Sequence, residues 1–500
     1  MYIALILAAA LLSACEQKID TGWSIDQVTD DPVVEPVKVK SNAPLYWTVY
    51  EFCYEAEHAG QNTNMPAETM ESNIRWVSEN LLPYGYDMIV TDGFQSMYND
   101  RACNDQGYMT HYGYYSLRDL SALCQKYGLR LGVYDNPLWI HGPDDVIIKG
   151  TNIRLGSLKY DPAIDKVLHP EESAAANEWF SWLVPSHKGA KEYIDGFFRY
   201  YAEELNVRFI RMDFMCVFET GTGHGTASPA RGYGTEEYKL ALQYIQESAA
   251  KYGVFTSIVM PNCFNHAENE APYMNMMRIN ADVFCGRWSA FSGLENDWME
   301  VYGESSYYRH RGDIGSSWPQ CNNMFDGMVW FSDLSGRGKI ILDGDFTRLN
   351  TLSSDDECRS VISLQLVAGG PVACADQYNS PNIDRLVQYY QNEEMLALNK
   401  DGFVGKPLSR DLAKAESQIW TGQMSDGDWI VAFFNREPTE QTRYLSFATF
   451  GENTMNVRDL WEHTDLGEQT SLSATLPPHA CKVFRLSKST DNIQTINRRL

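Results

Sequence analysis

Short apolar runs and longer helical patterns alternate along most of the chain, from Pro44 to about residue 405. Eight of the runs are rich in Val, Ile, Leu and Met without polar alternation, which is typical of strands buried on both faces. We predict these strands at 45–50, 87–91, 129–134, 208–213, 254–259, 276–283, 339–343 and 366–372. We predict helices at 68–82, 117–127, 190–205 and 235–252. Repeated strand–helix units form parallel sheets, and eight of them predict a closed (β/α)8 TIM barrel over residues 44–405.

After residue 405 the pattern changes to short strands separated by turn residues. Apolar runs lie at 417–421, 429–434, 443–447 and 480–485, and Asp426-Gly427 marks a turn between two of them. These features predict an antiparallel β-sandwich over residues 406–490, followed by a polar tail at 491–500.

The chain begins with an apolar segment, and its first charged residue is Glu16. This segment is too short to span a bilayer and ends in small residues, which is typical of a signal peptide. Leu12-Ser13-Ala14-Cys15 resembles the bacterial lipobox, so we expect residues 1–15 to be a lipoprotein signal and Cys15 to carry lipid. An ordinary secretory signal is the alternative. Residues 16–43 are polar and predict a flexible tether, which would place the protein at the cell envelope, periplasmic or surface-exposed.

Charge and composition narrow the classes of partner. The chain has 66 Asp+Glu against 41 Lys+Arg, a net charge of -25, and no basic run that could grip nucleic-acid phosphates. With 44% hydrophobic and 13% aromatic residues it is not a disordered chain. We therefore expect a folded protein that binds no nucleic acid and meets the membrane only through its lipid. None of the 11 cysteines lies in a Cys-x-x-Cys pair, and their disulfide pairing stays open.

Aspartates stand at the ends of four predicted strands. Asp92, Asp213 and Asp282 each stand at or next to the end of one strand, and a fourth strand ends at Asp343 and is followed by Asp345. A single such residue is readily explained as the N-cap of the next helix. Four strands that carry one at the same rim of a barrel favour a functional site there. Converging carboxylates suit either glycoside hydrolysis or metal binding. The loop histidines form no ligand-spaced pair, and we expect no metal and no organic cofactor; they are His58, His141, His187, His224 and His266.

The order of several phrases resembles glycoside hydrolase clan D, family 27, which contains α-galactosidases and α-N-acetylgalactosaminidases. The phrases are Pro44–Phe52, Leu129–Tyr134, Phe209-Ile-Arg-Met-Asp213, Arg278-Ile-Asn-Ala-Asp282, Asp343-Gly-Asp345 and, in the sandwich, Val457–Trp461. The resemblance implies a retaining hydrolase with Asp213 as nucleophile and Asp282 as acid/base. It implies that substrate is bound by Tyr50, Asp92, Tyr134, Arg211, Arg278, Asn262 and Asp345.

Three positions depart from the family pattern and bear on the sugar. Thr91 replaces the first of two adjacent aspartates, and Arg211 replaces a lysine. The loop at 257–263 lacks the residues expected of either galactose-type specificity. The resemblance implies exo-hydrolysis of terminal α-linked galactose-like sugars from oligo- or polysaccharides, and these departures indicate a shift in the sugar that is accepted. A β-L-arabinopyranosidase, an isomaltose-releasing dextranase and a non-catalytic glycan-binding lipoprotein are the alternatives.

Overall fold

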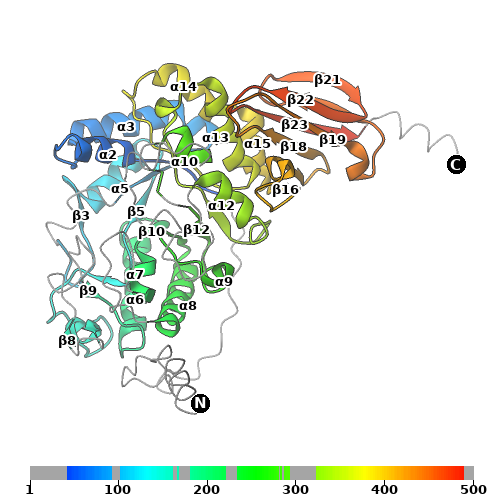
Figure 1. Ribbon diagram of the computed structural model, residues 1–500. Helices are drawn as coiled ribbons and strands as arrows, with labels where there is room; N and C mark the ends of the chain where they lie inside the picture. The colour runs from blue at the N-terminus through cyan, green and yellow to red at the C-terminus, as the bar shows by residue number, and fades with distance from the viewer. Residues whose placement is uncertain are drawn as a thin grey trace, which may run out of the picture.

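The computed structural model describes residues 42–92, 102–161, 166–167, 181–220, 234–280, 282–283, 286–292 and 323–488. Its largest sheet comprises β1 (Leu45–Thr48), β2 (Met88–Val90), β5 (Arg130–Tyr134), β10 (Phe209–Met212), β11 (Phe255–Ile258), β12 (Met276–Arg278), β13 (Ile341–Asp343), β14 (Phe346–Thr347) and β15 (Val372–Cys374). The strands pair in parallel in the order β13-β12-β11-β10-β5-β2-β1-β15-β14 (Figure 1). This curled parallel sheet confirms the predicted TIM barrel.

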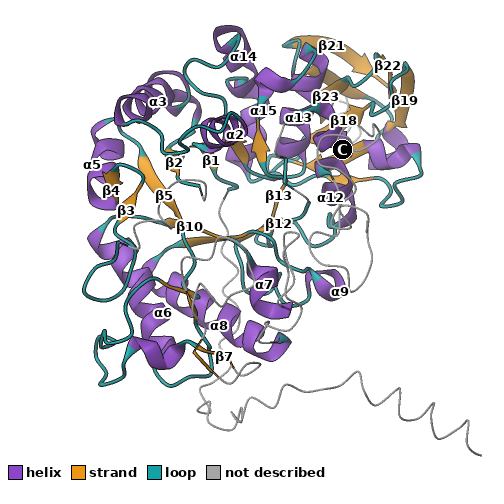
Figure 2. Cartoon of the chain, turned by 60° about the vertical axis from the view of Figure 1, so that its left-hand side comes forward, coloured by secondary structure: helices purple, strands orange, loops and turns teal. Residues whose placement is uncertain are grey.

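The two ends of the sheet are joined by a break in a single strand. Only Gly344 and Asp345 separate β13, which pairs with β12, from β14, which pairs with β15. Asp345 has a φ of 80°, and this left-handed conformation interrupts the strand because an L-residue cannot continue a sheet there. The broken strand therefore closes the ring of strands seen in Figure 2.

Helices cover the outside of the barrel (Figure 2). They are α2 (Tyr50–His58), α3 (Ala67–Asn80), α5 (Leu117–Lys126), α6 (Ala190–Arg199), α7 (Met215–Thr220), α8 (Thr235–Tyr252), α9 (Phe264–Ala267), α10 (Trp288–Ser292), α12 (Met324–Trp330), α13 (Asp355–Val367), α14 (Ile383–Tyr390) and α15 (Glu393–Asp401). The shorter elements are β3 (His111–Tyr112), β4 (Tyr115–Ser116), β6 (Trp139–Ile140), β7 (Tyr160–Asp161), β8 (Lys166–Val167), β9 (Ser181–Trp182), the π-helix η5 (Tyr200–Glu204) and the 3-10 helices η2 (Leu82–Tyr84), η3 (Leu155–Leu158), η7 (Leu349–Thr351), η8 (Ala415–Gln418) and η9 (Phe447–Phe450).

Successive strand residues pack on opposite faces of the sheet, as a period of two requires. Tyr46 on β1 and Phe209 on β10 belong to the cluster inside the barrel, and their rings lie 5.7 Å apart. The next residues along these strands, Trp47 and Ile210, join the larger core beneath the helices. Both faces are apolar, which explains why the strands show no alternation in the sequence.

The C-terminal domain has two antiparallel sheets. Six strands pair in the order β16-β17-β18-β23-β20-β21 and two more, β19 and β22, form the second sheet. Their bounds are β16 (Lys406–Pro407), β17 (Ile419–Gln423), β18 (Trp429–Phe434), β19 (Gln441–Ser446), β20 (Met455–Asp459), β21 (Thr464–Gln469), β22 (Ser471–Leu476) and β23 (Cys481–Lys488). The predicted sandwich is confirmed. Buried contacts join it to the barrel, among them Trp461 Nε1, which donates to Ser363 Oγ of α13 at 2.8 Å.

Most predicted elements are confirmed to within a few residues, and the helix at 235–252 has the predicted bounds. The strand predicted at 366–372 is wrong, because residues 366 and 367 end α13 and the strand occupies Val372–Cys374. Most of α13 is buried, so its apolar residues give the same pattern as a buried strand. Tyr50, predicted to end the first strand, begins α2 instead.

Several predictions fall wholly or partly outside the described residues. The signal segment with Cys15, nearly all of the tether at 16–43, and the polar tail lie there. Among the described residues, no helix has both the length and the apolar content that a bilayer-crossing segment needs. Eight cysteines fall in the described part of the chain, and no disulfide joins any two of them.

Candidate active site

Asp213 directly follows β10 and is the first of the predicted catalytic residues. Its Oδ2 accepts a hydrogen bond from the hydroxyl of Tyr134 at 2.8 Å, and its Oδ1 accepts one from the backbone N–H of Phe214 at 2.6 Å. Asn136 donates its side-chain amide to the Asp213 carbonyl oxygen at 2.9 Å. These three bonds fix both the carboxylate and the peptide that carries it.

The turn after Asp213 is also held by the neighbouring strand. Phe214 has a φ of 59°, which turns the chain sharply into α7. The amides of Met215 and Cys216 then donate to the carbonyl oxygens of Val259 and Met260, just past β11. The carboxylate therefore stands on a backbone that two strands position.

Burial raises the pKa of Asp213, and the negative charge of Asp282 raises it further. The Phe214 N–H, the Tyr134 hydroxyl and the Arg211 guanidinium lower it. Because Asp282 acts on this pKa, the two predicted catalytic carboxylates lie within electrostatic range of each other. Such a pair is what a two-carboxylate hydrolase needs.

Asp282 lies four residues beyond Arg278, which ends β12. The Arg278 guanidinium forms ion pairs with Asp282 and with Asp345, and its Nε donates to the carbonyl oxygen of Asn280 at 2.9 Å. The side chain of Asp282 keeps 19% of its surface exposed, whereas Arg278 keeps 1%. Asp282 is thus held from inside the barrel and still reachable from outside.

Asp345 is shared by two buried arginines. It accepts from Arg278 and, at 3.3 Å, from Arg211, and its Oδ2 accepts from the Val283 amide at 2.8 Å. Arg211 also donates to Asp343 at 2.8 Å. Burial raises the pKa of Asp345 to about 6 although both arginines lower it. A chain of alternating charges therefore runs beneath the two catalytic candidates.

These contacts place three of the predicted substrate-binding residues in the barrel wall. The side chains of Arg211, Arg278 and Asp345 are 2%, 1% and 0% exposed, and each has a protein partner. Side chains alternate between the two faces of a strand, so Arg211, two residues before Asp213, points into the barrel. The structure brings all three together in one ion-pair network, which also includes Asp282.

The aromatic candidates lie close to the same charges. The Tyr50 ring stacks on Phe346 at 4.2 Å between centroids, and Asp282, Asp345 and Asp92 each raise the pKa of Tyr50, after burial. Asp92 is 5% exposed, and its amide donates to the Tyr112 hydroxyl at 2.8 Å. Tyr50 therefore lies within electrostatic range of Asp282, Asp345 and Asp92.

Asn262, predicted to bind substrate, lies in the loop after β11. It is fully buried, and its amide nitrogen donates at 2.6 Å to Glu219, which lies on α7. Glu270 lies nearby and accepts from Tyr238 at 3.2 Å and from the Cys263 amide at 3.4 Å. Burial raises the pKa of Glu270 to about 8, and the charge of Glu219 adds to this. These contacts tie the loop after β11 to α7.

Sequence reasoning missed a polar cluster at the end of β5. Asp135 is fully buried and accepts from Tyr201 at 2.6 Å, and His141 Nε2 lies 3.0 Å from its other oxygen. Asn136, which follows it, holds the Asp213 peptide. The signal was present, because Asp135 also stands just past a predicted strand, as the other candidates do.

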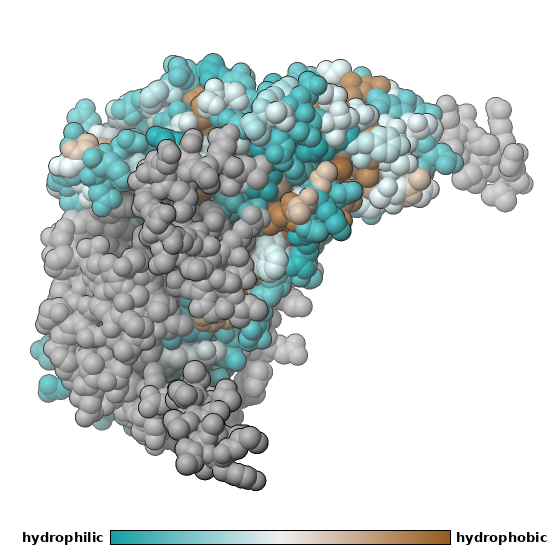
Figure 3. All heavy atoms as spheres, viewed as in Figure 1, coloured by the Kyte–Doolittle hydropathy of each residue, from teal (hydrophilic) through white to brown (hydrophobic). Residues whose placement is uncertain are grey.

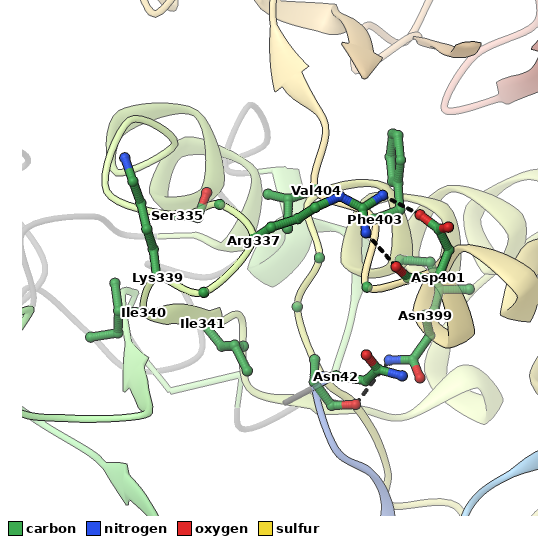
Figure 4. A pocket seen from close by; sticks show the side chains of 17 residues that line it. Asn42, Ser335, Arg337, Lys339, Ile340, Ile341, Asn399, Asp401, Phe403 and Val404 are labelled. Atoms are coloured by element: carbon green, nitrogen blue, oxygen red, sulfur yellow. Dashed lines mark hydrogen bonds and ion pairs between the residues drawn. The ribbon is translucent and has the colours of Figure 1, made fainter. Parts of the chain in front are cut away.

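No group of three or more potential metal-ligating side chains occurs among the described residues. A cavity of about 250 Å³ lies where β13 and β15 begin, the end of the barrel opposite to Asp213 (Figure 4). Arg337 and Asp401 form an ion pair in its lining. This cavity is separate from the candidate active site.

Comparison with known proteins assigns the class. The α-galactosidase C-terminal β-sandwich domain matches residues 414–486. An isomalto-dextranase from Arthrobacter globiformis is 34% identical over 470 residues, covering 89% of this chain and 67% of that protein. An α-galactosidase from Oryza sativa is 24% identical and covers 57% of this chain and 76% of that protein.

Solved structures agree with this assignment. The Arthrobacter globiformis T6 isomalto-dextranase complexed with panose has a TM-score of 0.77 at 31% identity, covering 92% of this chain and 76% of that one. A GH27 β-L-arabinopyranosidase from Geobacillus stearothermophilus shares the fold, with a TM-score of 0.65 at 18% identity over 90% of this chain and 97% of that one. The barrel, its carboxylates and these relatives define a glycoside hydrolase that acts on carbohydrate. The chain belongs to glycoside hydrolase family 27, the α-galactosidase family.

Proposed function

We propose that this protein is a retaining, exo-acting hydrolase that releases isomaltose from α-1,6-linked glucan. The similarity to isomalto-dextranase carries the proposal, because it spans 89% of the chain at 34% identity. The α-galactosidase from Oryza sativa matches 57% of the chain at 24% identity. The predicted galactose-like specificity is the second candidate, favoured by the match of the sandwich to the α-galactosidase domain.

The buried state of Arg211 supports the first candidate. A lysine at this position would offer a mobile ammonium group, whereas the Arg211 fork is engaged by Asp343 and Asp345. A sugar in the site therefore meets no free cation from this position. Loss of a polar partner changes which sugar hydroxyls are satisfied, and hence which sugar is accepted.

The proposed mechanism is a double displacement. Asp213 attacks the anomeric carbon while Asp282 protonates the departing glycosidic oxygen, which gives a covalent glycosyl-enzyme. Asp282 then takes a proton from a water molecule, which attacks the same carbon and frees Asp213. Tyr134 and the Phe214 amide orient the nucleophile, and Arg278 holds Asp282 in place between the two steps.

A substrate panel tests the specificity. Dextran, raffinose and nitrophenyl α-galactoside, α-glucoside and β-L-arabinopyranoside are each incubated with the enzyme, and released sugars are identified by chromatography. We expect isomaltose from dextran and slow or no release of galactose. Galactose from raffinose without isomaltose from dextran would favour the second candidate instead.

Azide rescue tests the catalytic roles independently of the glycon. In Asp213→Gly, azide should attack the anomeric carbon directly and give a glycosyl azide of inverted configuration. In Asp282→Gly, azide should attack the glycosyl-enzyme and give the retained configuration. The same product configuration from both variants would contradict the assignment.

Export as a cell-envelope lipoprotein is part of the proposal and rests on Leu12-Ser13-Ala14-Cys15. Expression of the full chain in a bacterium with radiolabelled palmitate should label it, and Cys15→Ser should abolish the label. Secretion of an unlabelled, cleaved wild type would instead support an ordinary signal peptide.

A further inference from the structure

Trp330, the last residue of α12, stands out on the flank of the barrel beside the sandwich. It is 38% exposed, and no other tryptophan in the described part of the chain is as exposed. Figure 3 shows apolar side chains between the barrel and the sandwich, in the view of Figure 1. Because a tryptophan buries a large apolar area when it is covered, an exposed one is a natural contact surface for a partner.

Charged side chains frame the Trp330 ring. The Arg410 guanidinium carbon lies 5.9 Å from the ring centroid, and Arg410 Nε donates to the Trp330 carbonyl oxygen at 3.1 Å. The His266 ring meets the Trp330 ring edge-on, with centroids 6.1 Å apart. Asp333 joins both, at 2.8 Å from His266 Nε2 and 3.0 Å from Arg410. His266, Asp333 and Arg410 therefore form a frame around Trp330 whose contacts exist without a ligand.

The three side chains of the frame are also partly exposed to solvent. The side chains of His266, Asp333 and Arg410 are 29%, 43% and 43% exposed. His266 and Arg410 hold the pKa of Asp333 below its usual range, although partial burial alone would raise it, so the carboxylate is an acceptor. The frame offers donors and acceptors at the edge of an aromatic face.

The backbone beneath the frame is fixed across the domain boundary. Lys406, on β16 of the sandwich, donates to the carbonyl oxygens of Ser332 and Ser335, two and five residues after Trp330. Arg410 follows four residues later on the same segment. The platform formed by Trp330, His266, Asp333 and Arg410 thus joins both domains and needs little ordering to bind, which lowers the cost of association.

We propose that this platform is a second carbohydrate-binding site, which holds a distant part of the glucan chain that the active site cleaves. A pyranose presents one C–H face that suits an aromatic ring, and hydroxyls at its rim that suit planar charged groups. The platform combines both features. The choice of glucan as ligand rests on the proposed function.

Binding at two sites raises the effective concentration of a polymer at the enzyme and does nothing for a short substrate. We therefore expect Trp330→Ala to raise the KM for dextran by about 3- to 10-fold. Its kcat/KM on a nitrophenyl glycoside should stay within about twofold of wild type, because Trp330 is outside the catalytic machinery. Tyr444→Ala is the matched control, since Tyr444 is 59% exposed on β19.

Binding without turnover is measured on Asp213→Asn, by affinity electrophoresis in gels that contain dextran. Adding Trp330→Ala or Arg410→Ala should reduce the retardation, and adding Tyr444→Ala should not. Equal retardation in all variants would overturn the proposal. So would a loss of self-association in Trp330→Ala, seen by sedimentation, with dextran binding intact, because the platform would then contact a second copy of the chain.

The two proposals fail in different ways. If the wild type does not hydrolyse dextran, the proposed function fails. If it hydrolyses dextran and Trp330→Ala does so with an unchanged KM, the second site alone fails.

Discussion

The hydroxyl of Tyr134 lies 2.8 Å from Asp213 Oδ2, although the two residues are 79 positions apart in the chain. The parallel register of β5 and β10 brings them together, because it sets Tyr134 beside Arg211, two residues before Asp213. A shift of this register by one residue would turn Tyr134 to the other face of the sheet. The pairing of two strands is thus what orients the candidate nucleophile.

Replacing Tyr134 by phenylalanine removes one of the groups that lower the pKa of Asp213. The pKa of Asp213 should rise, so that a higher pH is needed to ionise the nucleophile. We expect the acid limb of kcat/KM to move to higher pH and kcat to fall by about 10- to 100-fold. The pH profile on an activated aryl glycoside measures this. An unchanged acid limb would show that the hydroxyl does not act on Asp213.

Replacing Asp345 by asparagine removes one of the carboxylates paired with Arg278 and leaves its ion pair with Asp282. The uncompensated guanidinium then stabilises the ionised form of Asp282, which must be protonated to act as the acid. We expect the alkaline limb of kcat/KM to move to lower pH, and the loss of rate to be largest for substrates with poor leaving groups.

Substrates with different leaving groups discriminate best between the possible roles of Asp345. Dextran hydrolysis should fall by about 100-fold, and hydrolysis of a dinitrophenyl glycoside, which needs little acid assistance, by about tenfold or less. Asp343→Asn is the matched control, because it removes a buried carboxylate whose ion pair is with Arg211. Equal losses on all substrates would mean that Asp345 only supports the fold.

Replacing Arg211 by lysine tests the buried network itself. An ammonium group cannot span Asp343 and Asp345 as the guanidinium fork does, so one of these two carboxylates loses its bond to residue 211. We expect a loss of about 2–4 kcal/mol in the free energy of unfolding, because a broken buried ion pair leaves an uncompensated charge. Chemical denaturation measures the loss. A variant as stable as wild type would contradict the described network.

Replacing Glu270 by glutamine should change how stability depends on pH. The folded protein keeps Glu270 protonated up to about pH 8, whereas the unfolded chain ionises it near its ordinary pKa of 4.5. The free energy of unfolding of the wild type therefore falls as pH rises between these values. Glu270→Gln removes this loss and retains an acceptor for Tyr238 and the Cys263 amide.

We expect Glu270→Gln to unfold at a higher temperature than wild type at pH 8, by a few degrees, and at a similar temperature at pH 4.5. Calorimetry at the two pH values measures the difference. A variant that is equally destabilised at both would show that the carboxyl group is needed for packing alone.

The sequence by itself determined the barrel, the sandwich and the two catalytic candidates. Unalternating apolar runs require strands buried on both faces, and parallel strands place their C-terminal ends at one rim. Asp213 and Asp282 could therefore be placed in one site from position alone. The same rule would have found Asp135, whose strand ends at Tyr134.

Only the tertiary structure decided what the remaining residues do. Arg211 and Asp345 are separated by 134 positions, and their ion pair depends on how β10 and the broken β13–β14 strand lie across the barrel. The hydrogen bond from Asn262 to Glu219 likewise depends on where α7 packs. Sequence pattern fixes which face a strand residue points to, but the partner it meets there is set by packing between segments distant in the chain.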